Sequence, residues 1–216
     1  MGINFKELKA YSALSWISYD DVGDLKNKIL NGYIEKDNEL FKKNYDSSGF
    51  QVTAFEKGDE IVIAIRGTEV SNEFLDNLLI ADGSLAFNSI SSSQTNSMMD
   101  YINSIAGTLR TYKQMGKSTT IVGHSLGGTL AQVASKMYPN LFDHCYTFNS
   151  PSGKNLAYPK IYKYENGYYY IMRGAPNKYL NTQIGEAFYN YQNSPMTTSV
   201  TDVRAKDALS LIANLR

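Results

Sequence analysis

Cysteine and histidine are scarce in this chain of 216 residues, which has one cysteine, Cys145, and two histidines, His124 and His144. A single cysteine excludes an intramolecular disulfide, and a cysteine-based metal site needs several thiolates. Two histidines cannot supply a three-histidine zinc site. The sequence therefore predicts neither a bound metal nor another cofactor.

Net charge and long apolar runs are lacking as well. The 21 Lys and Arg residues balance the 21 Asp and Glu residues, so no overall basic field attracts nucleic acid. The longest strongly apolar stretch, Ile61 to Ile65, is far shorter than the ~20 residues that span a bilayer. Residues 1–16 contain neither the apolar core nor the cleavage site of a secretory signal. We expect no nucleic-acid partner, and a location in the cytoplasm or export by a route that needs no signal.

What the chain does have is ample apolar content, 43% of its residues, which excludes disorder and suits one folded domain over residues 1–216. Apolar periodicity predicts strands and helices in alternation from residue 50 onward. The expected strands cover residues 50–55, 61–65, 118–122, 145–148 and 168–172, and the expected helices cover residues 5–19, 24–30, 98–115, 127–138 and 205–215. This order predicts right-handed crossovers, and hence an α/β fold with a mainly parallel sheet and helices on both faces.

The motif that bears chemistry is Gly123-His124-Ser125-Leu126-Gly127-Gly128, a Gly-x-Ser-x-Gly sequence between a β-branched strand and a small-residue helix. Such a serine lies on a sharp strand-to-helix turn, which exposes its hydroxyl above the edge of the sheet. The glycines are needed because the neighbouring backbone comes too close for a Cβ. The positive end of the following helix would stabilise an oxyanion, with the Leu126 amide as one donor. The sequence predicts a nucleophilic Ser125.

Together with Arg66-Gly67-Thr68 and with Thr147-Phe148-Asn149-Ser150-Pro151, this motif resembles the class 3 lipases of the α/β-hydrolase superfamily and their bacterial members. The resemblance spans roughly residues 5–190. It implies an α/β-hydrolase fold, with Thr68 as the second oxyanion-hole residue beside Leu126. It also implies a lid shortly after Thr68, within the Ser- and Asn-rich residues 69–97, through which the protein would touch a membrane peripherally.

A serine hydrolase also needs a base and a carboxylate that orients it. His124 adjoins Ser125 in the chain, so its ring should project elsewhere, and His144 begins a strand whose far end lies near the site. A five-residue strand is ~17 Å long, which places His144 at the wrong edge of the sheet. Neither histidine is expected to be the base.

In the family, the acid follows the strand after Asn149, usually in an Asp-Pro step; here Ala175 precedes Pro176. Three explanations remain open. In the first, which we favour, the chain is truncated before its C-terminal histidine and Ala175 is an inactivating change. In the second, it is a natural non-catalytic domain. In the third, Asp202 or Glu186 replaces the acid, and a further segment supplies the base.

The leading functional hypothesis is a hydrolase of lipid or other carboxylic esters that acts through an acyl-enzyme on Ser125 and is inactive in this chain. A phospholipase toxin, which would have an immunity protein as its partner, is a narrower form of it. The alternatives are a binding domain on a lipase fold, or another serine acyl-transfer enzyme such as a thioesterase or peptidase. Head group, acyl chain and oligomeric state are not encoded in any motif that we find.

Overall fold

The computed structural model describes residues 5–17, 32–36, 41, 44–45, 47–66, 92–153, 160–163, 165–171 and 178–204. Its helices are α1 (Phe5–Ile17), α4 (Ser92–Gln114), α5 (Leu126–Met137) and α6 (Thr182–Asn193). Its strands are β1 (Ile34–Lys36), β2 (Asn44–Tyr45), β3 (Gln51–Lys57), β4 (Glu60–Ile65), β5 (Ser118–His124), β6 (His144–Phe148), β7 (Ile161–Lys163), β8 (Tyr169–Ile171), β9 (Lys178–Leu180) and β10 (Ser199–Val203).

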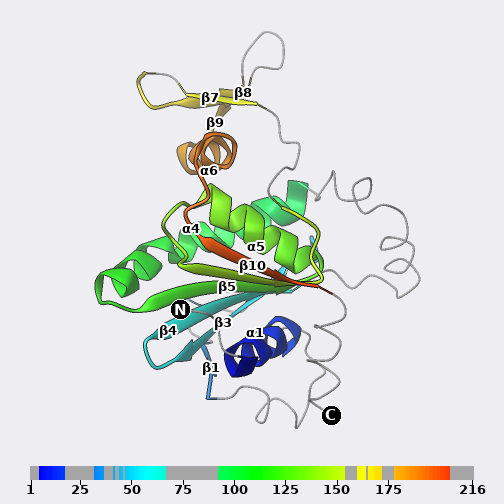
Figure 1. The fold of residues 1–216 in the computed structure, drawn as a ribbon. Coiled ribbons are helices and arrows are strands. Elements are labelled where there is room, and N and C mark those ends of the chain that lie inside the picture. The colour runs from blue at the N-terminus through cyan, green and yellow to red at the C-terminus, as the bar shows by residue number, and fades with distance from the viewer. Residues whose placement is uncertain are drawn as a thin grey trace, which may run out of the picture.

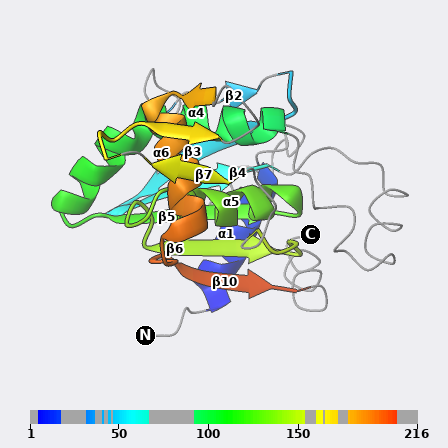
Figure 2. The same cartoon turned by 90° about the horizontal axis from the view of Figure 1, so that it is seen from above.

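Within these residues the main sheet has the strand order β1-β3-β4-β5-β6-β10, and β2 also pairs with β3. Strands β4, β5, β6 and β10 are parallel, whereas β1 to β3 pair antiparallel. The arrowheads of β6 and β10 therefore point to the same edge of the sheet (Figure 2). The carboxyl ends of the four parallel strands share one edge, which we call the C-terminal edge; the opposite one is the N-terminal edge.

Helices cover both faces of the main sheet, with α1 on one side and α4 and α5 on the other (Figure 1). In β4, Ile61, Ile63 and Ile65 belong to the core under α4 and α5, while Val62 and Ala64 belong to the core under α1. All five side chains are fully buried. The strand formed by the longest apolar stretch of the chain is thus covered on both faces, and the predicted α/β fold is confirmed.

Three expectations about elements need correction. The long helix predicted from residue 98 begins at Ser92, so residues 92–97 of the suggested lid form the start of α4. The strand predicted over residues 168–172 exists as β8, but it pairs with β7 and β9 in a separate antiparallel sheet. The strand next to β6 is β10, whose polar sequence gave no apolar signal. The helices expected over residues 24–30 and 205–215 lie outside the described residues.

Candidate active site

Ser125 joins β5 to α5 with φ 52° and ψ −126°, a backbone conformation that non-glycine residues rarely adopt. Its N–H donates to the Phe148 carbonyl at 3.0 Å, and its own carbonyl accepts from the N–H groups of Gly128 and Thr129 at 3.0 and 3.2 Å. The chain thus changes from strand to helix within one residue. This is the strained turn that the sequence predicts for Ser125.

The glycines around Ser125 are required by close approach of the backbone. A Cβ on Gly123 would overlap the carbonyl group of Gly127, and a Cβ on Gly127 would overlap the carbonyl oxygen of Ile65. A Cβ on Gly128 would lie 2.7 Å from the Oγ of Ser150. Real Cβ atoms do not come this close to other heavy atoms, so the spacing of the motif follows from how tightly α5 is seated on β4 and β5.

The first turn of α5 leaves backbone N–H groups directed at the C-terminal edge, since the first N–H groups of a helix have no partner within it. Leu126 is the first residue of this helix. Thr68 lies outside the described residues, but Arg66, two residues before it, ends β4 directly beside the helix. The Arg66 carbonyl carbon is 2.6 Å from where a Cβ on Gly127 would be. The buried Arg66 guanidinium donates to the Gln51 side chain at 2.5 Å.

The ring of His124 turns away from Ser125 toward α1. It packs against Trp16 with ring centroids 4.5 Å apart, and its Nδ1 is buried with no hydrogen-bond partner among the described residues. Burial lowers the pKa of His124 to about 4, so the ring is neutral at pH 7. As the sequence suggests, this histidine has a packing role.

His144 begins β6 at the N-terminal edge, where it pairs with Thr120 of β5 and Ser199 of β10. Thr120 is five residues before Ser125, a separation of about 16 Å along a strand. His144 therefore lies far from Ser125, as expected. With both histidines assigned, none of the 216 residues is a histidine that can serve as the base.

Ala175 lies outside the described residues, so its assignment to the acid position stays a prediction. The strand before it, β8, belongs to the separate sheet, and β10 is the strand next to β6. Groups that act together in a parallel sheet gather at the carboxyl ends of adjacent strands. A carboxylate near the end of β10 is therefore a second candidate for the acid, beside the predicted position at Ala175.

Two carboxylates fit that placement better. Asp202 is near the end of β10, where it accepts from the Thr147 hydroxyl at 2.8 Å and from Arg204 Nε at 2.6 Å. Asp207 follows β10 by four residues in the sequence and lies outside the described residues. The ends of β6 and β10 are joined by a bond from the Asn149 N–H to the Val203 carbonyl at 2.9 Å.

Glu186, the other suggested acid, is excluded by its position. It lines a groove between α4, α6 and the end of α5, together with Arg110 and Tyr138. Ser125 precedes the opposite end of α5, and twelve helical residues span about 18 Å. Glu186 therefore cannot orient a base at Ser125.

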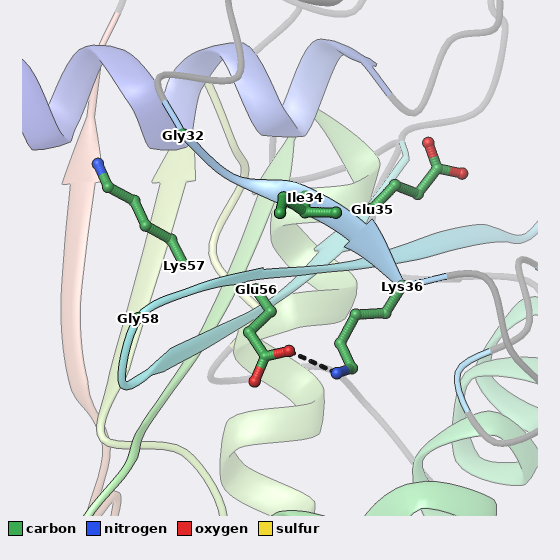
Figure 3. Close-up of a pocket in the computed structure, with 7 residues that line it drawn as sticks. All are labelled: Gly32, Ile34, Glu35, Lys36, Glu56, Lys57 and Gly58. Atoms are coloured by element: carbon green, nitrogen blue, oxygen red, sulfur yellow. Dashed lines mark hydrogen bonds and ion pairs between the residues drawn. The ribbon is translucent and has the colours of Figure 1, made fainter.

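A second groove lies beside β1 and the β3–β4 turn (Figure 3). It is lined by Gly32, Ile34, Glu35, Lys36, Glu56, Lys57 and Gly58. Glu56 accepts there from Lys36 and, at 2.8 Å, from Lys117. Because Glu60 begins β4 just past this turn, the groove is at the N-terminal edge, away from Ser125. In the part of the chain that the structure describes, no group of three His, Cys, Asp or Glu residues is placed to hold a metal, and no helix is long and apolar enough to span a membrane.

A sheet with parallel central strands, helices on both faces and a strained serine between a strand and a helix defines an α/β-hydrolase. The family model of the class 3 lipases matches residues 62–176, which is 115 of the 216 residues. The chain belongs to the class 3 lipase family.

Six solved chains match in a comparison of structures, among them lipase II from Rhizopus niveus. That match has 12% sequence identity and a TM-score of 0.42, and it covers 67% of this chain and 62% of the Rhizopus chain. This chain thus corresponds to less than two thirds of that lipase. No curated protein sequence matches it.

Proposed function

We propose that this domain hydrolyses carboxylic esters of lipids through an acyl-enzyme formed on Ser125. The observation that carries the proposal is the strained backbone of Ser125 at the start of α5. Strain of this kind is kept where it orients a reacting group, since it otherwise only destabilises the fold.

In the proposed reaction, the Ser125 Oγ attacks the ester carbonyl carbon as its proton passes to a base. The oxyanion of the tetrahedral intermediate accepts hydrogen bonds from the Leu126 N–H and from Thr68. Collapse of the intermediate expels the alcohol, which takes up the proton from the base, and water then releases the fatty acid by the same steps. Oxyanion donors contribute ~3–4 kcal/mol each to lowering the barrier.

The base is not among these residues, because His124 packs against Trp16 and His144 lies at the other edge. We therefore expect these 216 residues alone to turn over esters slowly, with only the residual acceleration that an oxyanion hole gives. Asp207 or Asp202 would orient a base that is supplied from elsewhere. Under this proposal Ala175 has no part in the triad.

Added imidazole tests the proposal, because it can act as the missing base. Hydrolysis of a short-chain p-nitrophenyl ester by the chain should be slow and should rise with imidazole. The Ser125→Ala variant at each imidazole concentration corrects for the hydrolysis that imidazole itself causes. Asp207→Asn should reduce the stimulated rate, whereas Ala175→Ser should not. If no difference between the chain and Ser125→Ala appears on soluble esters or phospholipids, the proposal fails.

The second candidate, a lipid-binding domain without activity, is favoured by one observation, the lack of a usable histidine. It predicts lipid binding that Ser125→Ala leaves unchanged and no imidazole-dependent turnover. The narrower proposal of a phospholipase toxin predicts that expression with the missing base restored is harmful to the host, and that Ser125→Ala abolishes the harm. An immunity protein would be sought only after that result.

A further inference from the structure

The small sheet of β7, β8 and β9 is separate from the main sheet and packs on α6 (Figure 1). Its inner face packs on that helix through Ile161 and Tyr169, which are 3% and 4% exposed. The contact is close, because a Cβ on Gly185 of α6 would overlap the Cβ of Tyr169. The small sheet is therefore firmly held on one face, and its other face is turned away from α6.

The outer face of the small sheet carries a row of tyrosines. The strand register pairs Tyr162 with Tyr170, and directly paired residues share a face. The rings of Tyr162 and Tyr170 stack with centroids 5.3 Å apart. Tyr168, two residues before Tyr170, is 55% exposed. An aromatic row of this kind is unusual for a surface whose only contact is water.

One basic side chain accompanies these rings, since the ammonium group of Lys160 lies 5.3 Å from the ring centroid of Tyr162. The ammonium group of Lys163 lies 5.5 Å from the ring centroid of Tyr169, with which it pairs on the inner face. Both lysines are exposed. Residues 160–180 contain four basic residues and one acidic residue, a net charge of +3, although the whole chain is neutral.

We propose that the outer face of the small sheet, with Lys160 at its rim, docks the domain on an anionic lipid surface. Tyrosine suits such an interface because its ring is apolar and its hydroxyl stays among the head groups. Lysine places its charge at the phosphates while its stem lies along apolar surface. The choice of a lipid surface, rather than an acidic protein, rests on the proposed lipid substrate. Docking through the small sheet does not involve the suggested lid.

The test is co-sedimentation with phosphatidylcholine vesicles that contain or lack phosphatidylglycerol, at low and high salt. The chain should bind the anionic vesicles more tightly, and salt should weaken that binding. Each basic residue near such a surface contributes about fivefold in affinity, so Lys160→Gln should weaken binding about fivefold. Tyr168→Ala should weaken binding to both vesicle types.

Lys57→Gln is the matched control. Lys57 is an exposed lysine that also lies over a tyrosine, with its Nζ 5.0 Å from the ring centroid of Tyr33, but it is in the β3–β4 turn at the N-terminal edge. Its loss should leave vesicle binding unchanged. Thermal unfolding of each variant shows that it has folded.

The proposal is overturned if the chain binds neither vesicle type, if it binds both equally, or if the Lys57 and Lys160 variants behave alike. An acidic protein as the true occupant would give the first of these results. Turnover of a soluble ester depends on Ser125 and not on the small sheet, so it should be equal in all the lysine variants. Loss of vesicle binding with that turnover intact, or the reverse, separates this proposal from the proposed function.

Discussion

The N-terminal and C-terminal edges of the parallel strands differ in how fully their polar groups are hydrogen-bonded and in how relaxed their backbone is. At the N-terminal edge, Glu60 accepts hydrogen bonds from the hydroxyl groups of Tyr11, Tyr33 and Thr120 at 2.6, 2.6 and 2.7 Å. Through these short hydrogen bonds the Glu60 carboxylate links α1 to the sheet.

At the C-terminal edge, Ser125 and Asn149 both have positive φ, 52° and 48°, and a buried histidine nitrogen has no partner among the described residues. Native structures keep such departures where function requires them. The comparison indicates that the N-terminal edge stabilises the fold, whereas the C-terminal edge is less stable because its residues are arranged to form a site. The following predictions test that contrast.

The largest effect is expected at Gly127. Gly127→Ala would place a methyl group against the Ile65 carbonyl and should lower the free energy of unfolding by at least about 4 kcal/mol. The control is Gly107→Ala on α4, where no atom lies within 4 Å of the new Cβ; it should raise stability by about 0.5–1 kcal/mol. Urea unfolding measures both. A Gly127→Ala protein as stable as the unchanged chain would show that the elbow is not tightly seated.

At the N-terminal edge, Glu60→Ala should lower the free energy of unfolding by about 3 kcal/mol, because three hydroxyl groups lose a charged partner. Glu56→Ala is the matched control, since its ion pairs with Lys36 and Lys117 are partly exposed; it should change stability by at most about 1 kcal/mol. Hydrogen exchange should show faster opening of α1 in Glu60→Ala alone. Equal effects of the two variants would contradict the contrast.

The buried His124 makes stability depend on pH. Its pKa is lowered to about 4 by burial, whereas an unfolded histidine has a pKa near 6.5, so the unfolded chain binds the proton first as pH falls. Stability is therefore lost between about pH 6.5 and pH 4, and the loss should reach about 2 kcal/mol at about pH 5. Fluorescence of Trp16, the one tryptophan of the chain, can follow unfolding.

His124→Phe should remove that part of the pH dependence, because it keeps a ring against Trp16 but binds no proton. The comparison is the difference between the two proteins at about pH 7.5 and about pH 5, which cancels what all other titratable groups contribute to both proteins. If the two proteins lose the same stability, the pKa of His124 is not lowered.

The smallest effect concerns the backbone of Ser125. Ser125→Gly should raise the free energy of unfolding by about 1 kcal/mol, because glycine adopts φ 52° and ψ −126° without strain. Ser125→Ala should bring no such gain. Asn140→Gly is the control, since Asn140 has φ 64° in a turn at the other end of α5, and asparagine tolerates the left-handed region. Calorimetry would show whether the gain is specific to Ser125.

The central layers of the fold could be predicted because their signals are local. The apolar run Ile61–Ile65 indicates a buried strand, and the glycines around Ser125 indicate a tight turn between a strand and a helix. The predicted positions of β4, β5 and α5 are therefore close to the observed ones. The packing of His124 could also be inferred, since adjacent residues on a strand project to opposite faces.

Sheet membership could not be predicted in the same way. The apolar and aromatic residues of β8 indicate a strand, but nothing in them indicates which strand they pair with. In β10 the sequence Ser-Val-Thr-Asp-Val is polar on an exposed edge, so it resembles a loop. The choice between Ala175 and a carboxylate after β10 as the acid position depends on which strand adjoins β6, and local patterns do not decide that.

The late position of β10 in the chain has a consequence for folding during synthesis. Thr147 and Asp202, which bond across β6 and β10, are 55 residues apart in sequence, and the small sheet and α6 lie between them. Until residues 199–203 leave the ribosome, β6 is an unpaired edge with open N–H and C=O groups, a template for pairing with another chain. A ribosome that stalls within the small sheet would therefore release a nascent chain prone to aggregate, and chaperones would be needed over that interval of translation.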